Sequence, residues 1–398
     1  MLMLLLLACA SGPTEEPLES KKPVLKLYLF APDSPIVTRG EHGNVTSADD
    51  ERRINTLDVW VFEAGTNELV SYIPLANLDF EGSREISMEI TDEFALKASN
   101  INTKPNVDIY VVANATASNC GLTFSRETTP AQLEAALIEH KAEADGGDDF
   151  FGLKSPITSV PLDGLPMSGL LKNQSIDGSS PVFRATDNNG HLATVRLVRA
   201  VSRIRFIFSK SASSPDIRDL SVELNGGVLP TQEYLFLGEP YDYPNTLKQK
   251  HLPDNVAYES ENATLISGVS GSEINACDDP ASYAFVKESE NGQQYENRID
   301  QGLQEQTMGD VTKPAELTEL NRFYLRESDR KLTGKIYYRI GDSQRKDAPF
   351  LMWDEGDFTR NHTWIVYGYF LGNGNLMLNV VDAKTWDDDN DKGEIYNW

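Results

Sequence analysis

The sequence is poor in the residues that build disulfides and metal sites. Its 398 residues include three cysteines and five histidines. Cys120 and Cys277 are isolated and far apart in the chain, so they do not read as a disulfide framework or a metal site. We expect two partly buried thiols, although a bridge between them stays open. The histidines lack HExxH or paired-ligand spacing, so we expect no metal and no cofactor.

Motifs for catalysis and phosphate binding are also missing. The chain has no Gly-x-Ser-x-Gly elbow and no phosphate-binding Gly-Lys-Ser/Thr loop. Carboxylates are abundant, so a pair arranged for glycoside hydrolysis stays open without a motif to support it. We therefore expect a protein that is not an enzyme and has no catalytic residues.

Basic residues are too few for a protein that neutralises phosphates. The chain has 36 Lys and Arg against 61 Asp and Glu, a net charge of −25, which excludes nucleic acid as a partner. The simplest consequence is solubility, with calcium or a basic partner as the alternative. Asp387, Asp389 and Asp391 have the spacing of a calcium loop, but Lys392 stands where the EF-hand requires Gly. This favours a solvated acidic linker.

Long apolar runs are absent except at the N-terminus. The segment Met1–Cys9 (MLMLLLLAC) is too short to span a bilayer. Leucines followed by Ala8 and Cys9 are typical of a signal segment ending in a lipobox, where bacterial signal peptidase cleaves before a lipidated cysteine. We expect lipidation at Cys9, a lipoprotein signal and tether over residues 1–21, and an outer-membrane precursor.

The rest of the chain consists of short apolar segments separated by turn residues, which is typical of an all-β protein. In the first half we expect a strand at Val24–Phe30, a hairpin of Leu57–Phe62 with Leu69–Ile73, and a buried strand at Val107–Ala113. In the second half, we expect strands over 217–224, 233–237, 283–287, 322–325 and 335–340, and a hairpin of 363–370 with 376–381.

One helix and one boundary interrupt this pattern. Thr129 as a cap and Pro130 in the first turn predict a single amphipathic helix that continues past His140. Residues 144–155 and 173–189 are rich in turn formers and read as loops. Along 193–208 the alternation of apolar residues changes phase, which indicates a bulge or a bend between sheets. We place the domain boundary near residue 190, with β-sandwich domains at 22–190 and 191–398.

Several segments together resemble the fimbrillins of Bacteroidales, the subunits of type V pili. They are LDVWVF at Leu57–Phe62, VRLVRAVSRI at Val195–Ile204, FTRNHTW at Phe358–Trp364, and KTW at Lys384–Trp386. The resemblance implies two tandem transthyretin-like β-sandwiches with a short helical insertion. It also implies a lipidated precursor that reaches the cell surface, where an Arg-specific protease removes the N-terminal segment with its first strand.

In this sequence the matching cleavage position is Arg39–Gly40, with Arg52-Arg53 as a second option. Loss of the first strand would leave an apolar groove lined by unpaired backbone groups. A strand from another subunit can fill such a groove, and the head-to-tail contact then propagates a filament. The removed strand would carry Val24, Leu25, Leu27 and Leu29, and the candidate donor residues are Ile395, Tyr396 and Trp398.

These expectations predict a structural subunit of a surface pilus that serves adhesion. Its partners would be other pilus subunits, the Arg-specific maturation protease, the outer membrane through the lipid anchor, and a host or bacterial surface ligand. Stalk, tip and anchor roles all stay open. The alternative is a surface lipoprotein that binds glycans through exposed aromatic residues, and a hydrolase is the third hypothesis.

Overall fold

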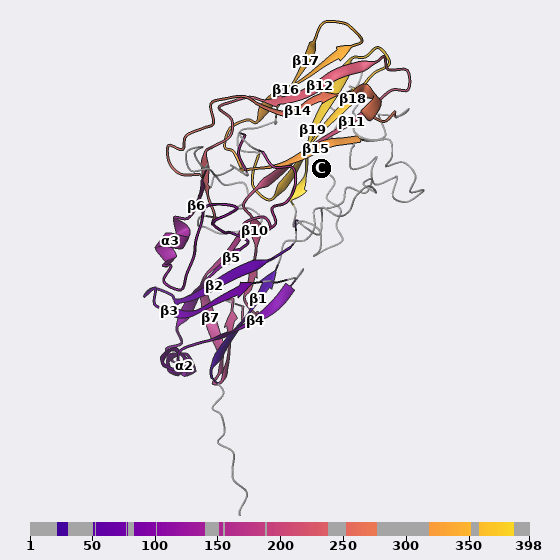
Figure 1. Cartoon of the computed structure of the whole chain (residues 1–398). Coiled ribbons are helices and arrows are strands. Elements are labelled where there is room, and N and C mark those ends of the chain that lie inside the picture. The colour runs from indigo at the N-terminus through magenta and orange to yellow at the C-terminus, as the bar shows by residue number, and fades with distance from the viewer. Residues whose placement is uncertain are drawn as a thin grey trace, which may run out of the picture.

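The computed structural model describes residues 22–30, 51, 53–76, 78, 83–100, 102–139, 151–153, 156–187, 189–237, 252–276, 318–351 and 358–385. Within these ranges the chain is all-β, with two sandwiches placed end to end (Figure 1). This confirms the predicted all-β sandwich fold. The described helices are too short and too polar to cross a membrane.

The first sandwich is built from one sheet that folds over itself. Its strands join in the order β3-β2-β5-β7-β8-β1-β4, with β10 paired to β7 and β9 paired to β1. They are β1 (Val24–Phe30), β2 (Thr56–Glu63), β3 (Leu69–Ala76), β4 (Ser83–Glu89), β5 (Asn106–Ala113), β7 (Met167–Ser179), β8 (Val182–Thr186), β9 (Thr194–Arg196) and β10 (Val198–Arg199). β7 pairs with β5 through its first part and with β8 through its last part, so it belongs to both layers.

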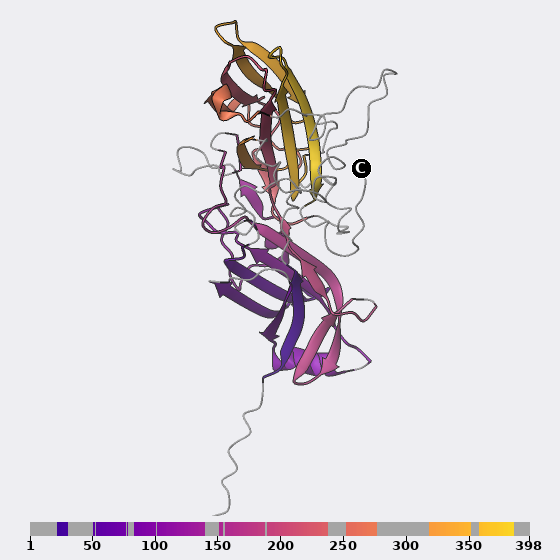
Figure 2. The ribbon, with the colours of Figure 1, turned by 90° about the vertical axis from the view of Figure 1, so that its right-hand side faces the viewer.

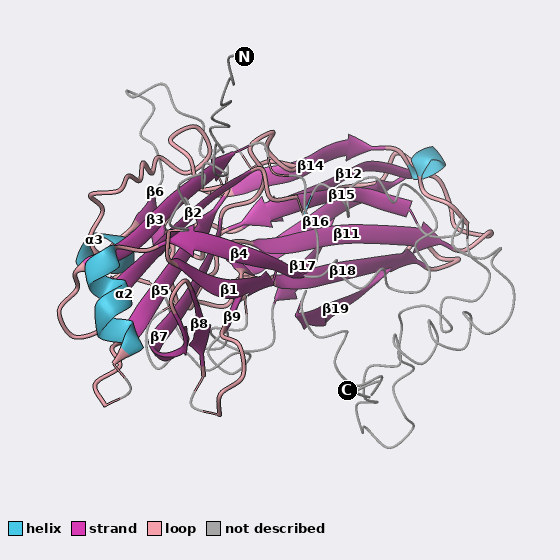
Figure 3. Ribbon diagram, turned by 90° about the horizontal axis from the view of Figure 1, so that it is seen from below, coloured by secondary structure: helices cyan, strands magenta, loops and turns pink. Residues whose placement is uncertain are grey.

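The second sandwich consists of two four-stranded sheets. One has the order β15-β11-β18-β19 and the other β14-β12-β16-β17. The strands are β11 (Ser202–Lys210), β12 (Ile217–Leu224), β14 (Ala263–Val269), β15 (Thr318–Leu325), β16 (Thr333–Ile340), β17 (Lys346–Leu351), β18 (His362–Phe370) and β19 (Leu376–Thr385). In Figure 3, α2, α3 and the strands of the first sandwich lie on the left, and the strands of the second sandwich lie to their right.

Each sandwich has its own apolar core, and the two cores meet near residue 202. The first core includes Val201 and the second begins with Ile204 along β11. The change of apolar phase over 193–208 is therefore a bend between sheets: β9 and β10 belong to the first sheet, and β11 belongs to the second sandwich. The domain boundary at residue 190 stays a prediction.

The expectation of a single helix was wrong. An unpredicted helix, α2 (Asp92–Ser99), is capped by the Thr91 hydroxyl and buries Phe94 in the first core. It closes the end of the first sandwich that faces away from the second (Figures 1 and 2). The predicted helix is α3 (Pro130–Glu134), shorter than expected. It ends because β6 (Leu137–Glu139) leaves it to pair with β13 (Gln232–Tyr234).

The expectation of a loop over 173–189 was also wrong. Most of this segment is the hairpin of β7 and β8. Its Ser, Asn, Gly and Asp side chains are mostly exposed or half-buried, while Ile176, Phe183 and Ala185 reach the core. Backbone pairing and a few buried side chains therefore outweigh the low strand propensity of the polar residues.

The packing of the second sandwich yields a prediction at Gly368 on β18. A Cβ atom at this position would overlap the ring of the buried Phe208 on β11. We expect Gly368→Val to lower the free energy of unfolding by about 1–3 kcal/mol, because the core has no space for the added atoms. Urea unfolding followed by circular dichroism measures this. Leu96→Ala, at a side chain 76% exposed, is the control and should stay within about 0.5 kcal/mol of the parent.

Candidate strand-exchange site and sandwich junction

The first strand of the chain is an interior strand with partners on both sides. β1 pairs antiparallel with β4 along its whole length, from Val24 opposite Glu89 to Phe30 opposite Ser83. On its other side it pairs parallel with β8 through Val24–Lys26 and with β9 through Tyr28–Phe30. Removing β1 would leave unpaired backbone groups on β4, β8 and β9 at once.

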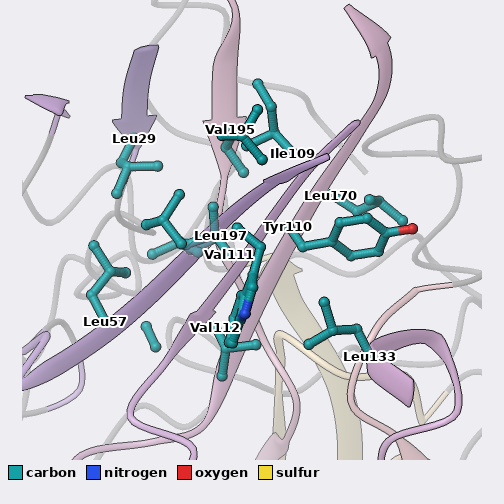
Figure 4. Close-up of a cluster of buried hydrophobic side chains, with 14 of the residues drawn as sticks. Leu29, Leu57, Ile109, Tyr110, Val111, Val112, Leu133, Leu170, Val195 and Leu197 are labelled. Carbon is teal, nitrogen blue, oxygen red and sulfur yellow. The ribbon is translucent and has the colours of Figure 1, made fainter. Parts of the chain in front are cut away.

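The side chains of β1 alternate between the core and the surface. Leu25, Leu27 and Leu29 are 0% exposed and belong to the first core. Leu29 projects into the same cluster as Leu57 of β2 and Val195 of β9 (Figure 4). Full burial of such a side chain is worth roughly 1.5–3 kcal/mol. β1 is thus a substantial part of the core although it lies at the N-terminal end of the described chain.

The polar face of β1 is held by ion pairs that are worth less. Lys26 Nζ lies 2.6 Å from a Glu85 carboxylate oxygen, and Lys22 Nζ, before the strand, lies 2.8 Å from Glu89. Most of the Lys22 and Glu89 side chains is exposed to solvent, and such pairs contribute little. Backbone pairing and the three leucines therefore hold β1 in place.

β1 runs between the two ends of the first sandwich. At its start, the Pro23 carbonyl accepts a hydrogen bond from the Ile90 amide, just before α2. Its far end pairs with β9, which is followed by β10 and the crossing into the second sandwich. Figure 2 shows β1 spanning the first sandwich from the α2 end toward the second sandwich.

The other residues predicted for processing and assembly lie outside the described residues. These are Cys9, Arg39, Gly40, Ile395, Tyr396 and Trp398. The described chain ends at Thr385, which pairs with His362 at the start of β18. Of the predicted site, the structure therefore describes the strand with Val24, Leu25, Leu27 and Leu29 and the groups that hold it.

A buried polar cluster that the sequence pattern did not reveal lies where the two sandwiches meet. We call Glu51, Arg199, Arg203 and Tyr324 the Glu51 latch. The Glu51 carboxylate accepts hydrogen bonds from Arg203 Nη1 at 2.7 and 2.9 Å and from the Tyr324 hydroxyl. Its backbone carbonyl accepts from Arg199 Nε at 3.0 Å. All four residues are at most 4% exposed, so the cluster is sealed from water.

The latch joins parts of the chain that are distant in sequence. Glu51 precedes β2, Arg203 lies on β11 and Tyr324 on β15. Burial, followed by the nearby Glu51 carboxylate, raises the pKa of the Tyr324 hydroxyl, so the phenol stays neutral and donates to the carboxylate. The only signal in the sequence was the pair of arginines within an apolar strand run, and this signal did not identify their partner.

A second buried cluster at the junction surrounds Arg360, which is 0% exposed. Its guanidinium donates to the Glu327 carboxylate at 2.6 and 2.9 Å. It also donates to the carbonyl of Leu235 at 3.0 Å and that of Tyr234 at 2.6 Å. Leu235 and Phe236 pack in the first core, although they follow β12 of the second sandwich. Arg360 thus fixes a segment that crosses from one sandwich to the other.

Glu233 in this cluster is a carboxyl group with an unusual environment. It is completely buried, and one carboxyl oxygen, Oε1, has no hydrogen-bond partner among the described residues. Its Oε2 accepts from the Glu327 amide at 3.1 Å and lies 3.6 Å from Arg360 Nη2. Burial, with the neighbouring Glu327 carboxylate as a further cause, raises the pKa of Glu233 to about 8 despite the attraction of Arg360.

Aromatic side chains, potential metal ligands and cysteines are the residues on which the alternative functions depend. No Trp, Tyr or Phe for which the structure gives a burial is exposed. Among the described residues no group of three potential metal ligands is found. Cys120 is buried, and its thiol donates to the Thr116 carbonyl at 3.3 Å. Cys277 lies outside the described residues, so its pairing stays open.

Comparison with known proteins points to one family. Residues 25–183 match the family model of the major fimbrial subunit protein (FimA). This match begins within β1 and ends within β8, so it spans most of the first sandwich. The N-terminal part of the chain is therefore similar in sequence to the major fimbrial subunit family. No curated protein matched the chain.

Three solved structures are similar to the chain over most of their length. A fimbrilin (FimA) of Porphyromonas gingivalis W83 is 12% identical, covering 91% of this chain and 97% of its own, with a TM-score of 0.46. The tip fimbrial protein Mfa3 of Porphyromonas gingivalis is 11% identical, covering 91% and 99%, with a TM-score of 0.43. A fimbrial assembly protein of Parabacteroides distasonis is 10% identical, covering 92% and 97%, with a TM-score of 0.42.

The environment of Glu233 predicts a pH dependence of stability. Between the ordinary pKa of 4.5 and the raised pKa of about 8, the folded state holds a proton on Glu233 that the unfolded state has lost. Glu233 therefore makes stability fall as pH rises through this window, by up to about 1.4 kcal/mol per pH unit. Glu233→Gln keeps the shape without the ionisation. We expect its stability relative to the parent to increase from pH 5 to pH 8, as measured by urea unfolding at each pH. A constant difference between the two proteins would contradict the raised pKa.

Proposed function

We propose that this fimbrillin-like chain is a structural subunit of a bacterial surface fimbria, joined to other subunits by exchange of a β-strand. In this proposal the chain performs no catalysis, and its activity is the formation of contacts between subunits. The partners are other fimbrial subunits and the protease that exposes the assembly site.

One observation carries the proposal: β1, the first described strand, is paired on both sides in the middle of the first sandwich. No described strand precedes β1, so a single cut after it would separate it covalently from the other described strands. It is nevertheless paired on both sides and buries three leucines completely. A strand at the edge of a sheet could be lost with little consequence, whereas loss of β1 opens a slot in the middle of a core.

The proposed route begins with a precursor lipidated at Cys9 and held at the outer membrane. An Arg-directed protease then hydrolyses the Arg39–Gly40 bond, after which only noncovalent contacts retain β1. Those contacts are cooperative, because the backbone pairs and the buried leucines form or break together. β1 therefore leaves only when another strand can take its position between β4 and the pair β8 and β9. Until then, β1 shields this slot from water and from nonspecific strand pairing.

The slot sets the requirements for its occupant. A donor strand must pair with β4 on one side and with β8 and β9 on the other. It must also place apolar side chains at every second position, because alternate residues of a strand face the same side. In the tail proposed as donor, Tyr396 and Trp398 have this spacing. The contact is heterologous and does not close, so repeated donation gives a filament.

Cleavage of the purified chain tests the proposal directly. We expect treatment with an Arg-specific protease to cut at Arg39 and to yield filaments visible by electron microscopy, with the fragment containing β1 released into solution. Arg39→Ala is the matched control and should stay uncut at this position and monomeric. Complete cleavage at Arg39 with a monomeric product that has lost β1 would refute assembly by strand exchange.

Competition by a peptide tests the role of β1 itself. We expect a synthetic peptide of residues 22–30, added in excess during cleavage, to reoccupy the slot and to reduce the yield of filaments in a dose-dependent manner. In the control peptide, serine replaces Leu25, Leu27 and Leu29, so it keeps the backbone but lacks the buried side chains. This peptide should compete far more weakly, because each leucine contributes roughly 1.5–3 kcal/mol of burial. Equal inhibition by both peptides would show that the slot does not select its occupant by these side chains.

A further inference from the structure

Two further arginines lie close to the proposed cleavage site in the sequence. An Arg-directed protease could therefore cut at more than one position. Arg52 and Arg53 both precede β2, so the bonds after them satisfy the same sequence requirement as the bond after Arg39. A cut at either position would also release β1. Glu51 and Ile54, the residues that flank this pair, are both 0% exposed.

Upstream of the pair, Glu51 is held by both its backbone and its side chain. Arg199 Nε donates to its carbonyl oxygen at 3.0 Å, and Arg203 Nη1 donates to its carboxylate at 2.7 and 2.9 Å. The Tyr324 hydroxyl donates to the same carboxylate. Glu51 is 0% exposed, so it enters a protease only after leaving the junction between the sandwiches.

Downstream of the pair, a second set of contacts holds the backbone. The Arg53 carbonyl accepts from Asn114 Nδ2 at 2.7 Å, and the Asn55 amide donates to Asn114 Oδ1 at 2.8 Å. Asn114 and Ile54 are both 0% exposed. The Arg53–Ile54 bond therefore joins a carbonyl held by Asn114 to a buried residue, although the Arg53 side chain itself is exposed.

A protease binds several residues on each side of the bond that it cuts, in an extended conformation, so cleavage of a folded protein requires local opening. We propose that the Glu51 latch protects the bonds after Arg52 and Arg53 and thereby confines Arg-directed processing to the chain upstream of Glu51. This inference rests on the proposed maturation by an Arg-directed protease. It adds a residue that determines which arginine is used.

The protection has a consequence for the mature subunit. A cut after Arg52 or Arg53 would remove Glu51 together with β1, and Arg199 and Arg203 would lose its carbonyl and carboxylate in a sealed site. Removing one partner of a buried ion pair is strongly destabilising. A cut upstream of Glu51 removes β1 and leaves Glu51 in the junction. By directing cleavage upstream, the latch therefore keeps Glu51 in the mature subunit.

Limited trypsin digestion of the folded full-length chain tests the latch, with the cut positions identified by intact mass and N-terminal sequencing. In the parent we expect cleavage after Arg52 and Arg53 to be at least about 100-fold slower than in the urea-unfolded chain, because it requires opening of the latch. Glu51→Gln removes the charge and keeps the size, and Tyr324→Phe removes one donor to the carboxylate. We expect both variants to be cut after Arg52 or Arg53 at least about tenfold faster than the parent. Glu68→Gln, at an exposed side chain, is the matched control and should cut at the parent's rate.

Each outcome bears on the latch separately from assembly. Faster cleavage in a variant that keeps the parent's circular dichroism supports the latch, and if Glu51→Gln does not fold, Tyr324→Phe supplies this test. Parental resistance in folded Glu51→Gln and Tyr324→Phe would assign the protection to Asn114 and overturn the proposal. Rapid cleavage of the folded parent after Arg53 would also overturn it. None of these digestion results depends on filament formation. Failure of strand exchange would be seen separately, as a chain that is cut at Arg39 and stays monomeric.

Discussion

Two-sided pairing of β1 is the constraint on which the first sandwich depends. The strand supplies hydrogen-bond partners to β4, β8 and β9, and its three leucines fill the space between the layers. β4 has β1 as its only partner strand among the described residues. The second half of the folded sheet therefore holds together through a strand that contributes only seven residues. Buried backbone N–H and C=O groups need hydrogen-bond partners. A segment that displaces β1 therefore has to be another strand with apolar side chains at alternate positions.

The junction between the sandwiches has the opposite character, because it is built from contacts that do not separate easily. Two sealed ionic clusters, around Glu51 and Arg360, tie β11, β15 and the start of β18 to segments of the first sandwich. Buried ion pairs are weak evidence for overall stability, since desolvation offsets much of the attraction. They are strongly directional, however, and a partner removed from them is costly. In the proposed fimbria this confines strand exchange to the β1 slot and lets each subunit act as one stiff body.

The sequence predicts the parts of this fold that depend on local patterns. The hairpin of β2 and β3, the buried β5 and the hairpin of β18 and β19 follow from apolar alternation and turn residues, and the bend after residue 200 follows from the change of phase. The hairpin of β7 and β8 was missed because its polar residues have turn propensities, which pairing with β1 and β5 overrides. The Glu51 latch was missed for a different reason: its residues come from three distant segments, and no local pattern records that Glu51 meets Arg203 and Tyr324.

The order of β1 and the Glu51 latch along the chain determines what a cut in the intervening segment would remove. β1 ends at the last described residue before the segment 31–50, and Glu51 is the first described residue after it. The chain thus passes from a strand held by apolar contacts to a residue held by charge. Apolar contacts can be replaced by any strand with alternating apolar side chains, whereas the latch requires one carboxylate at one place. In the proposed route, a cut between the two would separate the exchanged strand from the residue that the junction requires. The same cut on the other side of Glu51 would release β1 equally well and would damage the junction, so the order of these elements along the chain, and not the number of arginines, decides which cleavage is productive.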